Sequence, residues 1–561
     1  MVNNSHPVLK SSASGDDINS GGVNTGLGRG DNRAVFADFP VNLLLIILAA
    51  GLFALAHPNP LVKNGLSILA WIMYLPALFV IRRSTPLICL FWGALYGFTA
   101  FSLFNYWLVS YHLLAGIFTS TLYLFYFALV FFALRFALVL FPRYGFILQW
   151  LIFISFEYLR TLGFLGYSYG ITGYTQWRTL PLIQIASLTG VWGVSALIIF
   201  PQTFAALYLL PRKSGARPFT FRVSGLTACI SIYLIALISS LVYGTAAPHD
   251  FSKYESARIA LIQHNTDPWK DEKSDYQNNF RILKRLSEEA LSQNPKPDLV
   301  VWSETAFVPM IYWHSHYRTD SDYYAQVKEL LDFLARQDVP FIIGNDDGRR
   351  EMTENGYIDR VDYNAAILFE QGKMIDVYRK IHLVPFTEHF PYKKQLPFLY
   401  KLLEDLDTHF WQKGTRSLVF DTSNGLRFST PICFEDTFGY LPRDFVKDGA
   451  ELLVNLSNDA WSHSLSCQMQ HLSMAVFRSV ENSRSSARAT ASGQTCAIAP
   501  DGKILAMAEP FTEAALSVSV PILTRSTFYT RHGDFLPYIF IIAAIVMALA
   551  GIARRFKPDA I

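Results

Sequence analysis

Few charged residues and few cysteines distinguish this sequence of 561 residues. Charged side chains make up 17% of the chain and the formal net charge is +3, so the composition gives no reason to expect nucleic-acid binding. The five cysteines form no C-x-x-C pair and no regular spacing, which argues against a disulfide framework and leaves no evident metal site. We therefore expect neither a metal nor another cofactor.

Long apolar stretches are abundant, and they are unevenly distributed. They are concentrated in residues 41–244 and return at 535–553, whereas the sequence between them has the mixed composition of a globular domain. A helix needs about 20 apolar residues to cross the hydrocarbon core of a membrane. On this criterion the sequence predicts eight transmembrane helices, at roughly 41–56, 65–81, 86–109, 113–141, 145–162, 180–210, 223–244 and 535–553.

Basic residues indicate how these helices are oriented. They cluster after the second, fourth and eighth predicted helices and between the sixth and seventh, at Arg82, Arg83, Arg143, Arg212, Lys213, Arg217, Arg222, Arg554 and Arg555. All of these clusters fall on one side of the membrane, and basic loops are typically cytoplasmic. The globular segment is therefore predicted to lie outside the cytoplasmic membrane.

The predicted helices divide the chain into four segments. Residues 1–38, rich in Ser, Gly, Asn and Asp, are expected to be a disordered leader. Residues 39–244 would form a membrane domain with seven helices, 245–534 the globular domain, and 535–561 a last transmembrane helix with a short cytoplasmic tail. Ala54-Leu55-Ala56 resembles a signal-peptide cleavage site, but the leader lacks a short basic region, so we favour an uncleaved anchor.

Two charged residues fall inside the fifth predicted helix. Glu157 and Arg160 are three residues apart, and charges in such segments usually pair or face a polar cavity. Two interpretations remain open at this stage. The residues either form a mutual ion pair or contact a lipid headgroup.

Strand-like and helical patterns alternate in the globular segment. Apolar runs predict strands at 257–265, 297–304, 339–346, 363–370, 374–380, 426–435, 450–459, 494–499, 503–507 and 516–520. Spaced apolar residues predict helices at 270–293, 322–337 and 467–487. This alternation favours an α/β sandwich with buried strands.

Reactive side chains stand at the ends of three predicted strands, namely Glu304, Lys380 and Cys433. Each has a structural alternative: a helix cap, a solvated charge and a core thiol, respectively. A thiol with its free pKa of about 8.5 is a poor nucleophile at neutral pH without a base or a nearby cation. Here Glu304 can accept the proton, and Lys380 can favour the thiolate and then an oxyanion.

The segments around these residues resemble the Glu-Lys-Cys signature of the nitrilase superfamily. The matching stretches are VWSET with Glu304, YRKIHLVPFTEHFP with Lys380, and PICFED with Cys433. With seven predicted membrane helices before the domain and one after it, the chain resembles the bacterial apolipoprotein N-acyltransferases. The resemblance implies an α-β-β-α sandwich on the periplasmic side of a helical bundle in the inner membrane.

The same resemblance implies a ping-pong acyl transfer, the last step of lipoprotein maturation. Cys433 would take an acyl chain from a membrane phospholipid as a thioester and pass it to the α-amine of a diacylglyceryl-cysteine. Glu304 would act as general base and then acid, and Lys380 would stabilise the oxyanion. The implied partners are a phospholipid donor, a diacylated apolipoprotein and the bilayer, and we expect a monomer.

Four supporting residues are also implied by the resemblance. Glu388 looks like the family's second glutamate, which supports Lys380 and the nucleophile. Glu435 resembles a cleft acid, and Phe434 follows the nucleophile where the family often has Tyr. Trp269 corresponds to a mobile aromatic near the substrate entrance, although a packed or exposed surface Trp is the alternative.

Some positions depart from the family pattern or have a structural interpretation. Thr387 replaces a common Gly, and NDAW continues with Ser-His-Ser-Leu-Ser instead of Phe-Gly-Asp. These changes leave the preferred acyl chain and headgroup open. Residues 389–406 and 440–445 are candidate membrane-dipping lids. The polar residues interpreted as structural are Asn455, Asp459, Glu481 and Arg484.

Two other functions remain possible from the sequence. A membrane-tethered amidase would use the same three residues but pass the acyl group to water. A transporter or receptor would use an inactive nitrilase-like domain as a sensor, and it would have no reason to retain Glu304, Lys380 and Cys433 together.

Overall fold

The structure, a computed structural model, describes most of the chain. The described residues are 38–208, 223–267, 269–270, 272–352, 356–405 and 408–555. The predicted leader, apart from residue 38, and the predicted tail after residue 555 lie outside them. Met1–Leu44 and Leu45–Ile561 form two compact units, and the contacts discussed below lie within the second.

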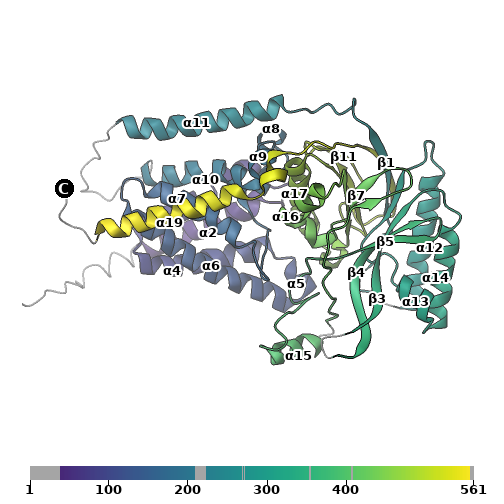
Figure 1. Cartoon of the computed structure of the whole chain (residues 1–561). Helices are drawn as coiled ribbons and strands as arrows, with labels where there is room; N and C mark the ends of the chain where they lie inside the picture. Colours follow the sequence, from purple (N-terminus) through teal and green to yellow (C-terminus); the bar gives the residue numbers. More distant parts are fainter. Residues whose placement is uncertain are drawn as a thin grey trace, which may run out of the picture. The chain divides into compact units, whose positions relative to one another are not determined.

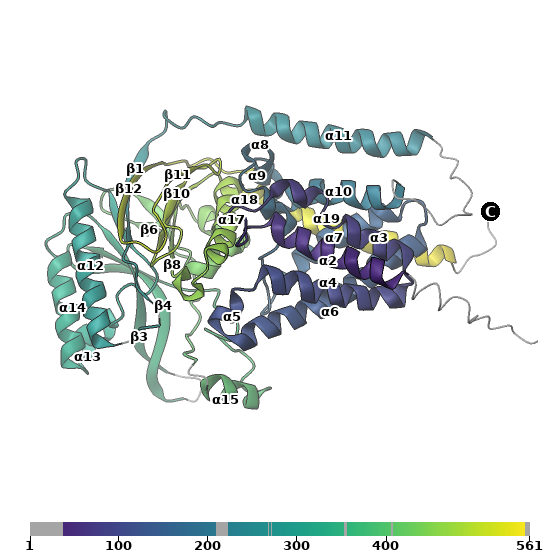
Figure 2. The same ribbon diagram turned by 180° about the vertical axis from the view of Figure 1, so that it is seen from behind.

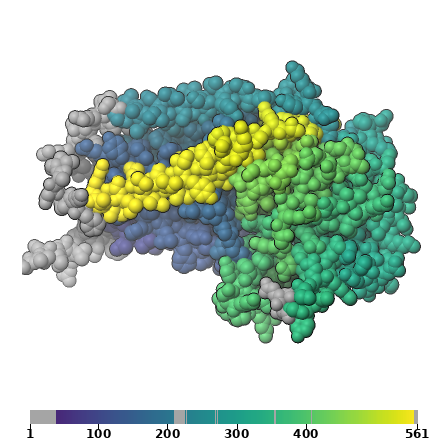
Figure 3. Space-filling view, viewed as in Figure 1, coloured from purple at the N-terminus to yellow at the C-terminus, as the bar shows by residue number. Residues whose placement is uncertain are grey.

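Six helices among the described residues are long and apolar enough to cross a membrane. They are α2 (Phe39–Ala56), α4 (Pro86–Phe104), α6 (Leu113–Leu140), α10 (Val191–Tyr208), α11 (Val223–Ala246) and α19 (Phe535–Arg555). Figure 1 shows α4, α6, α7 and α10 side by side, and α11 contacts α10 through Tyr233, which donates to the Leu197 carbonyl oxygen at 3.3 Å. In the space-filling view, α19 lies over the other membrane helices as a yellow band (Figure 3).

Three of the predicted spans are shorter or broken. The prediction of a continuous helix over 65–81 is wrong, because the structure has a 3-10 turn, η1 (Ser67–Trp71), and a separate α3 (Leu75–Arg83) there. The fifth predicted helix is α7 (Gly145–Leu159), whose 15 residues span about 22 Å, less than the roughly 30 Å hydrocarbon core. The sixth is divided into α8 (Leu180–Ile183), α9 (Ala186–Thr189) and α10, with Gly190 at φ 65° before α10.

Glu157 and Arg160 hold the loop that follows α7 and do not bind each other. Glu157 Oε1 accepts hydrogen bonds from the backbone N–H and hydroxyl of Thr172, at 2.8 and 2.5 Å. Arg160 donates to the carbonyl oxygens of Tyr167 and Tyr169, at 3.0 and 2.8 Å. The ion-pair interpretation is therefore wrong, because both side chains satisfy buried polar groups of the loop.

Two six-stranded sheets lie between α11 and α19 in the described residues. The first has the order β12-β1-β2-β3-β4-β5 and the second β11-β10-β9-β8-β7-β6. The strands of the first are β1 (Ser256–Gln263), β2 (Leu299–Trp302), β3 (Phe341–Met352), β4 (Ile358–Glu370), β5 (Lys373–Arg379) and β12 (Ala514–Pro521). Those of the second are β6 (Phe420–Asp421), β7 (Arg427–Ser429), β8 (Leu452–Ser457), β9 (Ser485–Thr490), β10 (Cys496–Ile498) and β11 (Ile504–Met507).

Helices cover both sheets, which confirms the predicted α-β-β-α sandwich. The helices α12 (Lys273–Leu291), α13 (Ile311–Tyr317) and α14 (Ser321–Leu334) lie on the first sheet, and α16 (Tyr440–Lys447) and α17 (Leu465–Asn482) on the second (Figures 1 and 2). Apolar side chains of both sheets form one core, among them Leu261, Val301, Phe428 and Val454. Leu441 and Phe445 of α16 belong to the same core, so the predicted membrane-dipping lid at 440–445 is wrong.

The helix α17 joins the sandwich to the membrane helices, and its side chains are buried from Ser466 to Asn482. Gln470 accepts a hydrogen bond from Trp107 Nε1 at 3.0 Å and donates to the Pro58 carbonyl oxygen at 2.9 Å. Glu481 accepts from the backbone N–H of Val191 at 3.0 Å. Buried polar contacts of this kind fix the register of two packed surfaces, because each group needs its partner.

Two glycines allow α4 and α6 to approach closely. A Cβ atom at Gly97 would lie 2.2 Å from the Tyr123 carbonyl oxygen, and one at Gly93 equally close to the Phe127 oxygen. Small residues four apart are typical of close helix contacts in membranes. Gly51 of α2 provides a contrast, since a Cβ there meets no atom within 4 Å.

We predict that Gly97→Ala lowers the thermal unfolding midpoint of the protein in detergent. Its methyl group would force α4 away from α6, an overpacking that costs about 1–3 kcal/mol. The matched control Gly51→Ala should leave the midpoint unchanged or higher, because alanine is the better helix former. Equal midpoints for the two variants would contradict this account of the packing.

Candidate active site

Three strands of the two sheets bring the predicted reactive residues together. Glu304 follows β2 by two residues, Lys380 follows β5 directly, and Cys433 opens the 3-10 turn η3 (Cys433–Thr437) after β7. Glu304 and Lys380 are in direct contact, and the charges of both act on the Cys433 thiol. Residues that are 53 to 129 positions apart in the chain therefore share one site.

Lys380 lies between two carboxylates and is completely buried. Its Nζ donates to Glu388 Oε1 at 2.8 Å and to Glu304 Oε1 at 3.2 Å. Burial alone would lower the pKa of this lysine, but the two carboxylates raise the pKa well above its usual value. Lys380 therefore keeps its proton, which suits a group that donates hydrogen bonds to an oxyanion.

Glu304 is held by two further donors. Asn364 Nδ2 donates to its Oε1 at 2.9 Å, and the backbone N–H of Asn458 donates to its Oε2 at 3.1 Å. The backbone N–H of Lys380 also donates to the Asn364 carbonyl oxygen at 2.8 Å. Asn364 thus ties Glu304 to the strand end that carries Lys380.

Cys433 is half-buried and has the unusual backbone angle φ 49°, in the left-handed region that non-glycine residues rarely adopt. Burial, and after it the Glu304 carboxylate, raises the pKa of its thiol well above the ordinary value. Lys380 and a hydrogen bond with Ser457 lower the pKa, as expected for Lys380, but these effects are smaller. The resting residue is a thiol, which would need a base in order to act as a nucleophile.

The loop that carries Glu388 packs against the membrane helix α6. Glu388 Oε2 accepts from the Val384 backbone N–H at 2.9 Å, and burial raises the pKa of this carboxyl. The Phe386 ring contacts Phe118 of α6, with the ring centroids 5.1 Å apart. Thr387, where the family commonly has Gly, hydrogen-bonds Tyr111.

Glu435 is fully buried and hydrogen-bonds backbone groups, so it is not an acid exposed in a cleft. Its carboxylate accepts from the backbone N–H groups of Ile381, His382 and Ile432, at 2.7, 2.9 and 2.8 Å. Burial raises its pKa to about 7. Glu435 thus ties the residues after Lys380 to the residue before Cys433.

The two predicted aromatic residues lie in different surroundings. Phe434 is buried, and its ring centroid lies 4.9 Å from that of Phe438. Trp269 is 53% exposed, and its ring centroid lies 5.9 Å from that of Tyr111. Tyr111 also contacts Trp461, at 5.2 Å, so three segments of the chain meet in aromatic contacts.

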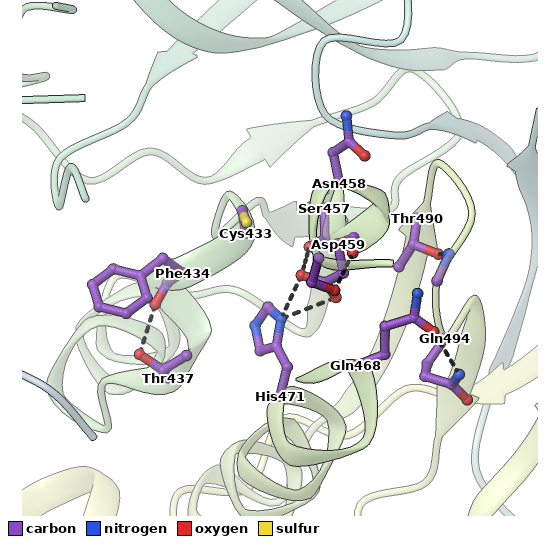
Figure 4. A network of polar contacts seen from close by, with 12 residues as sticks. Cys433, Phe434, Thr437, Ser457, Asn458, Asp459, Gln468, His471, Thr490 and Gln494 are labelled. Carbon is purple, nitrogen blue, oxygen red and sulfur yellow. Dashed lines mark hydrogen bonds and ion pairs between the residues drawn. The ribbon is translucent and has the colours of Figure 1, made fainter. Parts of the chain in front are cut away.

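Several polar residues around the site were not predicted from the sequence. Asn364 and Asn458 bind Glu304, and Ser457 binds the thiol; Asn458 opens the NDAW segment and Ser457 directly precedes it. His471 lies between Asp436 and Asp459, and Figure 4 shows its ring directed at Asp459. No sequence signal connects His471 with Cys433, because its carboxylate partners come from other elements.

The residues interpreted as structural mostly make backbone contacts. Asn455 donates to the Pro431 carbonyl oxygen at 2.9 Å, and Arg484 donates to the Ala450 oxygen at the same distance. Among the described residues, no group of three or more His, Cys, Asp or Glu side chains could hold a metal ion.

Comparisons with known proteins identify the family. Family models for the apolipoprotein N-acyltransferase N-terminal domain and for carbon-nitrogen hydrolase match residues 49–203 and 258–527. Apolipoprotein N-acyltransferase 1 of Treponema denticola is 42% identical over 543 residues, covering 94% of this chain and 98% of that protein. The chain belongs to the apolipoprotein N-acyltransferase family.

A second relative and a solved structure are also similar to this chain. Apolipoprotein N-acyltransferase 1 of Treponema pallidum is 43% identical over 536 residues, covering 91% of this chain and 96% of that protein. A crystal structure of an amidase from Nesterenkonia sp. has a TM-score of 0.35 and 18% identity, covering 51% of this chain and 96% of that one. The family resemblance inferred from the motifs is confirmed, and the chain is a multi-pass membrane protein with a nitrilase-like domain.

We predict that Glu304→Gln makes Cys433 more reactive toward iodoacetamide while abolishing acyl transfer. The Glu304 carboxylate raises the pKa of the thiol, so its removal lowers that pKa and increases the thiolate fraction at a given pH. A shift of one pKa unit gives about tenfold faster alkylation below the pKa. The rate is measured by mass spectrometry of the Cys433 peptide across pH 6–10.

The control for this variant is Glu329→Gln, which removes an exposed carboxylate of α14. It should leave both the alkylation profile and acyl transfer unchanged. Slower alkylation in Glu304→Gln would show that the carboxylate does not oppose thiolate formation.

Proposed function

We propose that this chain transfers an acyl chain from a membrane phospholipid to the α-amine of a diacylglyceryl-cysteine, with Cys433 as the nucleophile. The observation that carries the proposal is the buried Lys380 ammonium, held by Glu304 and Glu388 next to Cys433. Relatives that span nearly the whole chain are named apolipoprotein N-acyltransferases. A base, a fixed cation and a thiol are the groups that acyl transfer through a thioester requires.

In the first half-reaction Cys433 Sγ attacks the ester carbonyl carbon of the phospholipid, and Glu304 accepts the thiol proton. Lys380 donates a hydrogen bond to the resulting oxyanion. The ester C–O bond then breaks, and Glu304 gives its proton to the departing glycerol oxygen. The products are a lysophospholipid and an acyl thioester on Cys433.

In the second half-reaction the neutral α-amine of the acceptor attacks the thioester carbon. Glu304 accepts a proton from the amine nitrogen, and Lys380 again stabilises the oxyanion. The C–S bond breaks, and the proton held by Glu304 returns to the sulfur. The products are the amide and the resting thiol, so the proton balance closes without another co-reactant.

The proposed organisation has the globular segment, residues 245–534, on the periplasmic side of the inner membrane. At one end of the bundle, Arg82 donates to the Ala206 carbonyl oxygen and Arg555 to that of Val139, both at 2.9 Å. Val139 lies at the C-terminal end of α6. The N-terminal end of α6 follows Trp107, which contacts Gln470 of α17. These two basic residues and the sandwich are therefore at opposite ends of the bundle, which fits the positive-inside rule for this orientation, while Arg212, Lys213, Arg217 and Arg222 lie outside the described residues.

A helix in the loop after Glu388 supports a lipid-facing site. The helix α15 (Pro397–Asp405) has no buried residue, and Phe398 is 72% exposed. Exposed apolar groups on a short helix are typical of contact with a membrane surface. We propose that α15 inserts Phe398 and Leu402 into the outer leaflet beside the site.

We predict that incubation with phospholipid, in the absence of an acceptor, adds one acyl mass to Cys433. The Cys433→Ser variant should gain none, whereas the control Cys467→Ser should be acylated like the native chain. Intact-protein and peptide mass spectrometry measure the adduct. An acyl group on Cys467 or Cys496 would contradict the assignment of the nucleophile.

The same preparation distinguishes transfer from hydrolysis. Adding a diacylated lipopeptide should consume the thioester and yield the N-acylated peptide, whereas a tethered amidase would release free fatty acid instead. A protein that gains no acyl mass and forms neither product would fit the sensor alternative.

We predict that Phe398→Asp combined with Leu402→Asp slows acylation of Cys433 by phospholipid vesicles about tenfold. Burying one large apolar side chain contributes about 1.5–3 kcal/mol, so membrane contact by α15 should weaken. Acylation by a short-chain, water-soluble ester should be unchanged. The control Lys401→Asp adds negative charge at an exposed polar position of α15 and should have little effect; an equal loss there would exclude apolar insertion as the cause.

A further inference from the structure

A buried histidine binds two carboxylates behind the nucleophile. His471 of α17 is 1% exposed; its Nε2 lies 2.6 Å from Asp436 Oδ1 and its Nδ1 3.0 Å from Asp459 Oδ1. A neutral imidazole has only one N–H donor, so with both carboxylates ionised both contacts can be hydrogen bonds only if the ring is protonated. The geometry therefore makes His471 a buried cation, and Figure 4 shows its contact with Asp459.

His471, Asp436, Asp459 and Arg488 form a cluster, and its charges balance only when His471 is protonated. Arg488 of β9 also pairs with Asp436, so two carboxylates face two cations, and all four side chains are buried. Burial lowers the pKa of His471, but Asp459 and Asp436 raise it to about 9, with Arg488 opposing them. The ring of Tyr169 is the remaining titratable neighbour with a described contact, at 6.4 Å between centroids.

This cluster contacts the nucleophile without using Glu304 or Lys380. Asp436 is the fourth residue of η3, the turn that Cys433 opens. Asp459 accepts a hydrogen bond from the Ser457 hydroxyl at 3.2 Å, and Ser457 in turn hydrogen-bonds the thiol. The Asp459 carboxylate by itself raises the pKa of Cys433, so its charge opposes thiolate formation.

We propose that His471, as an imidazolium, is a positioning residue for the acyl transfer, neutralising Asp459 and anchoring Asp436 so that Ser457 and η3 hold Cys433 ready to attack. The proposal rests on the proposed function. Negative charge develops on sulfur and on the substrate oxygen during attack, and an unneutralised carboxylate nearby would oppose both. The thiol proton still passes to Glu304, so no proton leaves His471 and the cluster stays neutral throughout.

The test measures the pH dependence of Cys433 alkylation by iodoacetamide in the full-length protein in detergent, with Cys433→Ser as the background. His471→Gln keeps a polar side chain but removes the positive charge. We expect its alkylation rate at pH 7 to fall about tenfold, with the midpoint moved to higher pH by about one unit. Thioester formation from phospholipid should slow in parallel.

A second variant distinguishes an electrostatic effect of the cluster on the thiol from a purely structural one. Asp459→Asn removes the carboxylate that opposes the thiolate, so its alkylation at pH 7 should be as fast as in the native chain or faster. A purely structural role for the cluster would instead lower the rate in both variants. An unchanged profile in His471→Gln, or slower alkylation in both variants, would overturn the proposal.

A double variant covers the case in which His471→Gln does not fold. His471→Gln with Asp459→Asn removes one charge of each sign, so it should restore folding and most of the native alkylation rate. A double variant that folds but alkylates slowly would contradict the electrostatic role. Alkylation does not depend on acyl transfer, so a shifted profile without any phospholipid-derived thioester would refute the proposed function and not the effect of His471 on the thiol.

Discussion

The buried ammonium of Lys380 is the constraint around which the site is built. A charge without water is tolerated only when it is paired and hydrogen-bonded, and removing one partner of such a group is strongly unfavourable. Lys380 therefore needs Glu304 from the end of β2 and Glu388 from the loop that follows β5. Since Phe386 in this loop packs against Phe118 of α6, the membrane helices help to hold the second carboxylate in place.

Two charged groups of residues thus meet at Cys433, and they have different effects. The first contains Lys380 and two carboxylates, and burial together with the Glu304 charge keeps the thiol protonated at rest. The second, around His471, consists of paired charges with no net charge, and it lies between the second sheet and α17. In the proposed reaction, the resting sulfur is a thiol, so loss of its proton to Glu304 would accompany attack on the ester. A site of this kind limits reaction of the sulfur with other electrophiles until a substrate carbonyl is in position.

The sandwich could be predicted from the sequence because buried strands leave local patterns. Polar groups at the strand ends also pointed to Glu304, Lys380 and Cys433, which the structure brings together, while their catalytic roles stay a prediction. The break within 65–81 was not predicted, although Pro76 stands in the first turn of α3, where proline is typical of a helix start. Glu157 and Arg160 show the same limit, because their partners lie in a loop whose path the sequence does not indicate. His471 binds residues 12 and 35 positions away on other elements, so only the folded chain reveals its role.

The two acids that follow Phe434 explain why Cys433, the proposed nucleophile, sits in the segment PICFED. Cys433 has a backbone conformation that non-glycine residues avoid, and such a residue persists only where its surroundings fix it. Glu435 fixes the turn on one side by binding Ile432, Ile381 and His382, which joins it to the segment of Lys380. Asp436 fixes it on the other side through His471 and Arg488. Neither acid needs to touch a substrate, because together they determine where the sulfur lies relative to Lys380.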